Sequence, residues 1–217
     1  MALAHSNQWQ YQEFVNFNDT IKNANFGLLN YSQNIILRHF ISADEGGYGL
    51  GFNVFDCRAI EPLAIHNCTV IMFNLLSSSQ SSAQAQTTAK ALKLQVSFLP
   101  INISLLNNVN AGVDKSYFER IVKMQKLTAF KSHYAFPQHA IYCNDTTLLD
   151  VFLHEHLTNP NTIKLSEWIL AHPNLHIEIS NGILLAYQPN HILNADDIID
   201  AVEHIADISK SISLAHL

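Results

Sequence analysis

The sequence predicts an α+β protein, in which strands and helices occupy largely separate stretches of the chain. Three observations lead to this class. The first half contains four apolar runs with the composition of strands, which predict an antiparallel meander sheet. The second half contains helical patterns and the dipeptide Asn181-Gly182 between two alternating apolar runs, which predicts a β-hairpin. A long amphipathic segment at residues 195–213 then predicts a C-terminal helix.

Strand signals dominate the first half of the chain. Large apolar side chains recur at helical spacing within residues 8–24, which predicts one short helix before the strands. The stretch at 66–76 is almost continuously apolar, so we expect it to be a central strand. A meander of four strands is expected, at residues 33–42, 50–60, 66–76 and 92–100.

Helical signals are concentrated in the second half. Helices are predicted at residues 115–129, 147–158, 163–171 and 195–213, and an extended run is predicted at 139–143. Asp145 and Thr146 precede the second of these helices, and Asn194 precedes the last. All three residue types accept hydrogen bonds from the unpaired amides of a helix N-terminus, so we expect them to act as caps. Pro160 ends the second helix.

One segment divides the strand-rich part of the chain. Residues 77–91, SSSQSSAQAQTTAKA, contain no apolar side chain larger than alanine. Such a segment has little to bury, so we expect a flexible loop there. A single domain that spans residues 1–217 is expected, and two subdomains at about 1–110 and 111–217 are the alternative.

The charge balance argues against one class of partner. The chain has 12 lysines and arginines against 18 acidic residues, which gives a net charge of −6 with neutral histidines. A general nucleic-acid-binding protein needs a positive surface to displace counterions from phosphate, so no nucleic-acid partner is expected. No window is apolar over about 18 residues, so no transmembrane segment is expected. The first residues lack the pattern of a signal peptide, which predicts a cytoplasmic protein.

The three cysteines, Cys57, Cys68 and Cys143, are too far apart in sequence for a metal-binding CxxC pair. We interpret them as small buried side chains of a protein in a reducing compartment. Cys57 and Cys68 fall on neighbouring predicted strands, so a disulfide between them is left open.

Residues 151–158, VFLHEHLT, place His154 and His156 on either side of Glu155. Two metal ligands on one helix face need a spacing of about four residues, whereas residues two apart on a helix point about 200° apart. We therefore interpret this stretch as the polar end of a helix, where histidine is favoured by the helix dipole. A metal site would need a further ligand from elsewhere, for which His133 and His139 are the candidates.

Basic residues gather in one stretch of the acidic chain. Arg120, Lys123 and Lys126 follow one another at steps of three within the predicted helix 115–129. The plainest interpretation is a solvated helix face. The functional interpretation is a contact with an acidic protein partner, or a peripheral contact with an anionic membrane surface.

Several loosely spaced motifs resemble an uncharacterised family of bacterial proteins. They are Trp9-Gln10-Tyr11, the segment GGYGLGFNVFDCRAI at 46–60, the run SFLPINISLL at 97–106 and the hairpin LHIEISNGILLAYQP at 175–189. The sequence departs from the family at DCRAI, where aromatic residues are usual. The resemblance covers most of the chain and implies a bacterial α+β protein. It brings no catalytic residues, because the family has no established activity.

No recognised catalytic motif is present. The sequence lacks a GxSxG nucleophile elbow, and its glycine-rich stretch at 46–51 lacks the lysine of a phosphate-binding loop. We therefore predict a non-catalytic interaction or accessory protein that contacts a protein partner and needs no cofactor. One alternative is a metal-assisted hydrolase that uses the histidines with Glu155. The other is a small-ligand binder with a pocket between the sheet and the helices.

Overall fold

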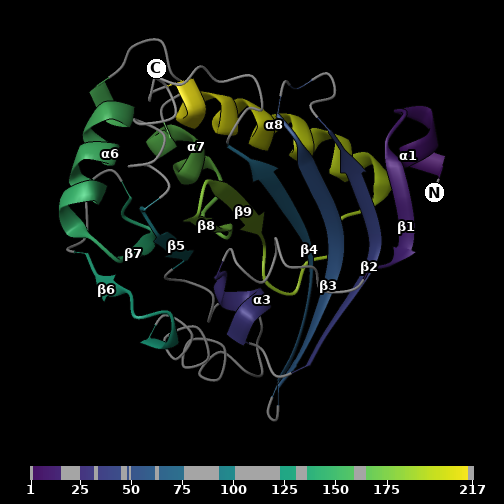
Figure 1. Ribbon diagram of the computed structural model, residues 1–217, viewed down its shortest axis with the longest axis horizontal. Coiled ribbons are helices and arrows are strands. Elements are labelled where there is room, and N and C mark those ends of the chain that lie inside the picture. The colour runs from purple at the N-terminus through teal and green to yellow at the C-terminus, as the bar shows by residue number, and fades with distance from the viewer. Residues whose placement is uncertain are drawn as a thin grey trace.

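The computed structural model of the protein describes residues 2–15, 25–31, 34–44, 48, 50–61, 64–75, 93–100, 123–130, 136–158 and 165–214. Over these residues, nine strands form one antiparallel sheet and helices pack on both of its faces (Figure 1). The predicted α+β class is confirmed. None of the described helices combines the length and the apolar character that crossing a membrane requires.

The strands are β1 (Gln10–Phe14), β2 (Asn34–Ala43), β3 (Phe52–Glu61), β4 (Ala64–Asn74), β5 (Val96–Pro100), β6 (Thr128–Ala129), β7 (His139–Cys143), β8 (His176–Ser180) and β9 (Ile183–Tyr187). The helices are α1 (Ala2–Ser6), α3 (Gly27–Tyr31), α6 (Thr146–Thr158), α7 (Leu165–Ala171) and α8 (Ala195–Leu214). Across the sheet the strands follow the order β1-β2-β3-β4-β9-β8-β5-β7-β6.

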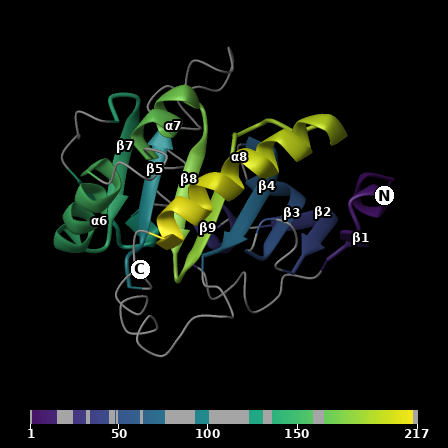
Figure 2. The same ribbon diagram turned by 90° about the horizontal axis from the view of Figure 1, so that it is seen from above.

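The two faces of the sheet carry separate apolar cores. On the face that we call the α8 face, side chains such as Phe52 and Val54 of β3 pack with apolar residues of α1, α6, α7 and α8. On the opposite α3 face, Phe55 and Cys57 of the same strand pack with Leu28 and its neighbours in α3. Side chains of β3 therefore alternate between the two faces. Figure 2 shows α8 lying across the strands on its face.

The predicted meander is confirmed, but its fourth member is β1 rather than β5. The predicted helix at 8–24 is wrong over Gln10–Phe14, and residues 16–24 lie outside the described part of the chain. Strand β1 pairs with β2, where Tyr11 lies opposite Ile41. Trp9 packs edge-on against Phe52, with ring centroids 5.2 Å apart. The apolar spacing suits a strand at a sheet edge as well as a helix, and pairing with β2 decides between them.

Strand β5 forms where it is predicted but does not lie beside β4. It pairs with β7 on one side and β8 on the other, while β9 pairs with β4. A tight hairpin between β4 and β5 would have made them neighbours, but many residues separate the two strands in sequence. The predicted flexible loop at 77–91 lies outside the described residues.

The predicted helix at 115–129 is wrong at its C-terminal end. Lys123 and Met124 are helical, Lys126 has a φ of 60°, and Thr128 already belongs to β6. A positive φ is left-handed backbone, which ends a helix. The side chain of Gln125 is buried at this point and bonds to the sheet, which fixes the turn. Residues 115–122 lie outside the described part.

The predicted helix caps are confirmed at Asp145 and Asn194, whereas Thr146 is already the first residue of α6. The carboxylate oxygen Oδ1 of Asp145 accepts hydrogen bonds from the amides of Thr147 and Leu148, at 2.9 and 3.0 Å. The Oδ1 atom of Asn194 accepts from the amides of Asp196 and Asp197, each at 3.0 Å. Both caps satisfy amides that have no partner within their own helix.

The hairpin turn between β8 and β9 is also confirmed. Asn181 and Gly182 have φ values of 52° and 72°, as a type I′ turn requires. We predict that Gly182→Ala lowers the free energy of unfolding by about 1–2 kcal/mol, because an alanine Cβ is strained in left-handed backbone. Gly51→Ala is the matched control, since its added Cβ would meet only ordinary contact with the Ala43 carbonyl at 3.7 Å. Equal losses in urea unfolding of the two variants would contradict the turn argument.

The cysteines are buried free thiols. Cys57 and Cys68 lie directly opposite each other on β3 and β4. A hydrogen bond with Cys57 is the largest cause, and burial the second, of a pKa of the Cys68 thiol well above its usual range. Because the thiolate is the reactive form, these contacts keep Cys68 unreactive.

Candidate functional site

The histidines that were the candidates for a metal site occupy different surroundings. His154 is exposed on α6, whereas His139 is buried at the start of β7, where its Nε2 donates to the Leu175 carbonyl at 3.1 Å. Burial lowers the pKa of His139, and this hydrogen bond opposes the shift. The side chains of Glu155 and His156, and all of His133, lie outside the described part. Within that part, no three His, Cys, Asp or Glu side chains are arranged to hold a metal ion.

The basic helix face predicted from Arg120, Lys123 and Lys126 does not form as predicted, because the helix ends after Met124. Lys123 and Lys126 are exposed, but Lys126 follows the last helical residue, so the two lysines do not form a helical stripe. Arg120 lies outside the described residues. A role of these three residues in partner binding stays a prediction.

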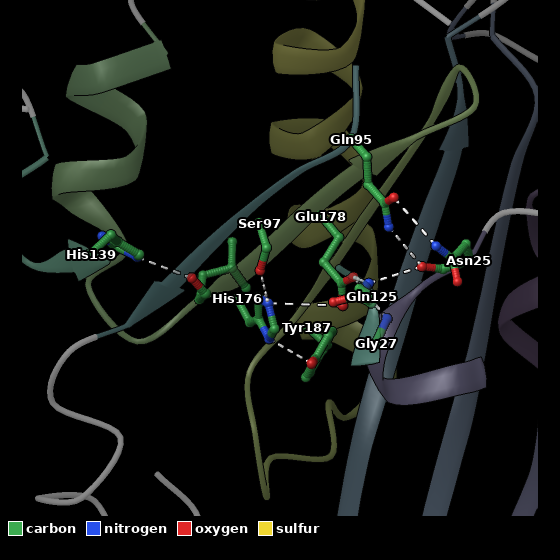
Figure 3. Close-up of polar contacts among 10 residues, drawn as sticks. Asn25, Gly27, Gln95, Ser97, Gln125, His139, His176, Glu178 and Tyr187 are labelled. Carbon is green, nitrogen blue, oxygen red and sulfur yellow. Dashed lines mark hydrogen bonds and ion pairs between the residues drawn. The ribbon is translucent and has the colours of Figure 1, made fainter. Parts of the chain in front are cut away.

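A buried polar network lies on the α3 face of the central strands (Figure 3). His176 of β8 contacts the Ser97 hydroxyl through Nε2 at 2.8 Å and the Tyr187 hydroxyl through Nδ1 at 2.5 Å. Burial, and secondarily the charge of His139, lowers the pKa of His176 to about 3. The ring is therefore neutral and donates from one nitrogen while it accepts at the other.

Glu178 is the carboxyl group of this network. Its Oε2 accepts hydrogen bonds from the Gly27 amide at 2.8 Å and from Gln125 Nε2 at 3.0 Å, and the Leu28 amide also donates to the carboxyl group. Its Oε1 lies 3.8 Å from His176 Nε2. Burial raises the pKa of Glu178 to about 7, although the three hydrogen bonds oppose this shift.

The network ties two distant segments to the sheet. The carbonyl of Asn25 accepts from Gln95 Nε2 at 3.1 Å and from Gln125 Nε2 at 2.9 Å (Figure 3). Ser97 and His176 have the chemistry of a nucleophile and its base. Both are 2% exposed or less, so a substrate could not reach them without movement of the covering segments. We interpret the network as a structural anchor for residues 25–31 and 123–126.

A more accessible site lies on the α8 face, between the sheet and helices α7 and α8. It is a cavity of about 150 Å³. Its apolar walls include Trp168, Ala201 and Ile205. Three histidines also line it: His172 after α7, His191 before α8, and His204 on α8. No carboxylate side chain is among the described residues that line it.

The polar groups of this cavity are held in place by neighbouring backbone. His172 donates from Nδ1 to the Trp168 carbonyl at 2.9 Å, and its ring lies 4.8 Å from the indole. The rings of His172 and His204 are 6.4 Å apart. The His191 carbonyl accepts from the Thr69 amide at 2.9 Å. The indole Nε1 of Trp168 is a buried donor with no hydrogen-bond partner in the structure.

Sequence reasoning missed both groups of residues, for different reasons. On β8, His176, Glu178 and Ser180 alternate with Ile177 and Ile179, so the period of a strand already puts the three polar residues on one face. The sequence therefore showed that these three residues share one face of the strand. It did not show that other segments cover this face and bury them. The three histidines of the cavity come from different elements and share no spacing that could be recognised.

The search for relatives adds no family to this geometry. Comparisons with protein-family models, with curated proteins and with solved structures found no match. The resemblance to a bacterial family therefore stays a prediction.

Proposed function

We propose that the protein binds a small organic acid in the cavity between the sheet and helices α7 and α8. The observation that carries this proposal is the convergence of His172, His191 and His204 on one apolar cavity. Concave apolar sites with a few positioned polar groups are the usual form of small-ligand sites. The volume of about 150 Å³ equals that of a cavity known to accept a benzene ring, so the apolar part of the ligand is about one ring in size.

The polar groups indicate the ligand's charge. A protonated imidazole carries positive charge and donates hydrogen bonds from both nitrogens, and the cavity places three imidazoles where no described lining residue is acidic. A carboxylate fits this lining, because its oxygens accept hydrogen bonds and its negative charge is opposite to that of a protonated imidazole.

This proposal develops the small-ligand alternative from the sequence. The cavity indicates the size and charge of its ligand. The exposed Lys123 and Lys126 do not indicate a particular partner, because exposed lysines are ordinary on any protein surface. Contact with a protein partner through these lysines remains a separate prediction.

The proposal predicts that ring-sized carboxylates stabilise the protein and that filling the cavity removes this effect. At a hundredfold excess over Kd, binding adds about 2.7 kcal/mol, or a rise in Tm of roughly 5–10 °C for a chain of this size. Thermal unfolding would be measured with benzoate, phenylacetate and the neutral benzyl alcohol. In Ala201→Leu, which places a larger side chain in the cavity, the rise with benzoate should disappear.

Matched variants separate this effect from general damage. Ala171→Leu makes the same change at an exposed position of α7 and should leave the rise intact. His204→Asn should weaken binding of the acids more than that of benzyl alcohol, while His154→Asn on α6 should change neither. Equal stabilisation of Ala201→Leu and the unmodified protein by benzoate would place the ligand elsewhere and overturn the proposal.

A further inference from the structure

A β-bulge in β2 gives His39 an unusual position. The pairing of β2 with β3 shifts between Arg38 and Ile41, and His39 has a φ of 52°. Leu37 and Phe40 both pack on the α3 face, although residues three apart in a regular strand point to opposite faces. The extra residue therefore resets the alternation. Bulges of this kind often re-aim a side chain beside an active site.

The re-aimed side chain meets a carboxylate on the α8 face. His39 Nδ1 lies 2.8 Å from Oδ2 of Asp56. The other oxygen, Oδ1, accepts a hydrogen bond from the Thr69 hydroxyl at 2.7 Å, and Thr69 Oγ1 in turn accepts from the Leu193 amide at 2.9 Å. The buried Thr69 thus orients Asp56 through Oδ1, and Asp56 holds the His39 ring through Oδ2.

The contact with Asp56 decides which nitrogen of His39 can act as a base. A carboxylate only accepts hydrogen bonds, so Nδ1 of the neutral ring carries the hydrogen and Nε2 carries the lone pair. The side chain of His39 is 57% exposed. The lone pair is therefore on Nε2, which does not contact Asp56, and the His39 side chain that carries it is accessible to solvent.

His39 and Asp56 also line a cavity of about 290 Å³. Its walls are mostly apolar and come from α1, β2, β3 and the start of α8, through Leu3, Ile41, Val54 and Ile198. Among its described lining residues there is no lysine or arginine, and Asp56 contributes a carboxylate. This cavity therefore favours a neutral apolar molecule over an anion.

We propose that His39 and Asp56 form a general-base site that hydrolyses neutral esters of short carboxylic acids. Nε2 of His39 removes a proton from water as the water oxygen bonds to the carbonyl carbon. Collapse of the tetrahedral intermediate breaks the bond to the leaving oxygen, which takes the proton back from the imidazolium. Ester and water become acid and alcohol, and His39 returns to its neutral form. Asp56 and Thr69 are positioning residues that hold the ring and its tautomer.

This site is separate from the proposed acid-binding cavity, although Thr69 and Leu193 line both. Its test uses turnover rather than ligand stabilisation, so one proposal can fail while the other stands. The acid that hydrolysis releases is of the class that the neighbouring cavity is proposed to hold.

The experiment measures hydrolysis of p-nitrophenyl acetate and butyrate by the full chain. His39→Asn should lower kcat/KM by about a hundredfold or more, the scale of general-base catalysis, and asparagine tolerates the positive φ of this position. His154→Asn is the control for exposed imidazoles and should be unchanged. The reaction should be slower in heavy water, because a proton moves in the rate-limiting step.

The positioning residues give a second readout. Thr69→Val should lower kcat with little change in KM, and Thr69→Ser, which keeps the hydroxyl, should restore kcat. Asp56→Asn should also lower kcat, because an amide can donate to Nδ1 and select the other tautomer. Unchanged turnover in His39→Asn would overturn the proposal. So would a stoichiometric burst of p-nitrophenol with no heavy-water effect, since that would show His39 attacking the ester directly.

Discussion

Replacing Glu178 with alanine should lower the free energy of unfolding by about 3–5 kcal/mol, because it leaves several buried donors without an acceptor. The donors are the amides of Gly27 and Leu28 and the side-chain amide of Gln125. The loss is large because Glu178 is only 2% exposed, so water cannot replace the lost oxygens without opening the core. Urea unfolding followed by circular dichroism measures it.

Two further variants identify the cause of this loss. Glu178→Gln keeps an acceptor oxygen and nearly the same volume, so its loss should be less than half of that in Glu178→Ala. Glu13→Ala, on the exposed part of β1, should stay within about 0.5 kcal/mol of the unmodified protein. If glutamine and alanine at position 178 were equally destabilising, the hydrogen bonds to α3 would not be the reason.

The second large effect is on the pH dependence of stability, where two buried groups act in opposite directions. Between pH 4.5, the ordinary pKa of a glutamate, and about pH 7, the folded protein keeps the Glu178 proton whereas the unfolded chain has lost it. Stability therefore falls as pH rises through this range. Between pH 6.5, the ordinary pKa of a histidine, and about pH 3, the folded protein keeps His176 neutral whereas the unfolded chain has it protonated. Stability therefore falls as pH is lowered through this range.

The two contributions largely cancel where the ranges overlap, between about pH 4.5 and 6.5. Glu178→Gln removes one of them and should expose the other. Relative to the unmodified protein, its stability should rise with pH by up to about 1.4 kcal/mol per pH unit. His176→Gln should show the opposite slope, and both are measured by urea unfolding at a series of pH values. Parallel curves for all three proteins would show that neither group changes its proton affinity on folding.

Local signals in the sequence were sufficient for many elements of the fold. The turn at Asn181-Gly182 and the caps at Asp145 and Asn194 depend on side chains within a few residues, so their physics is contained in short segments. The alternation of β3 is likewise a property of the strand itself.

The features that sequence reasoning missed depend on distant partners. Gln10–Phe14 is a strand because the edge of β2 is available to it. The place of β5 depends on a hairpin formed by residues 176–187. The candidate site is missed for the same reason, because His172, His191 and His204 meet only after α7 and α8 have packed on the sheet. The bulge at His39 interrupts a stretch whose composition is that of a regular strand.

The insertion of β8 and β9 between β4 and β5 has a consequence for synthesis on the ribosome. Strand β4 is buried and apolar, and one of its edges stays unpaired until β9 has been made, because Phe73 faces Leu184. At about 5–20 residues per second, this interval lasts roughly 5–20 seconds. An exposed apolar edge can pair with other chains during that time. We therefore expect nascent chains that stop before the hairpin to aggregate or to be held by chaperones, and pairing of β9 with β4 to end this exposure.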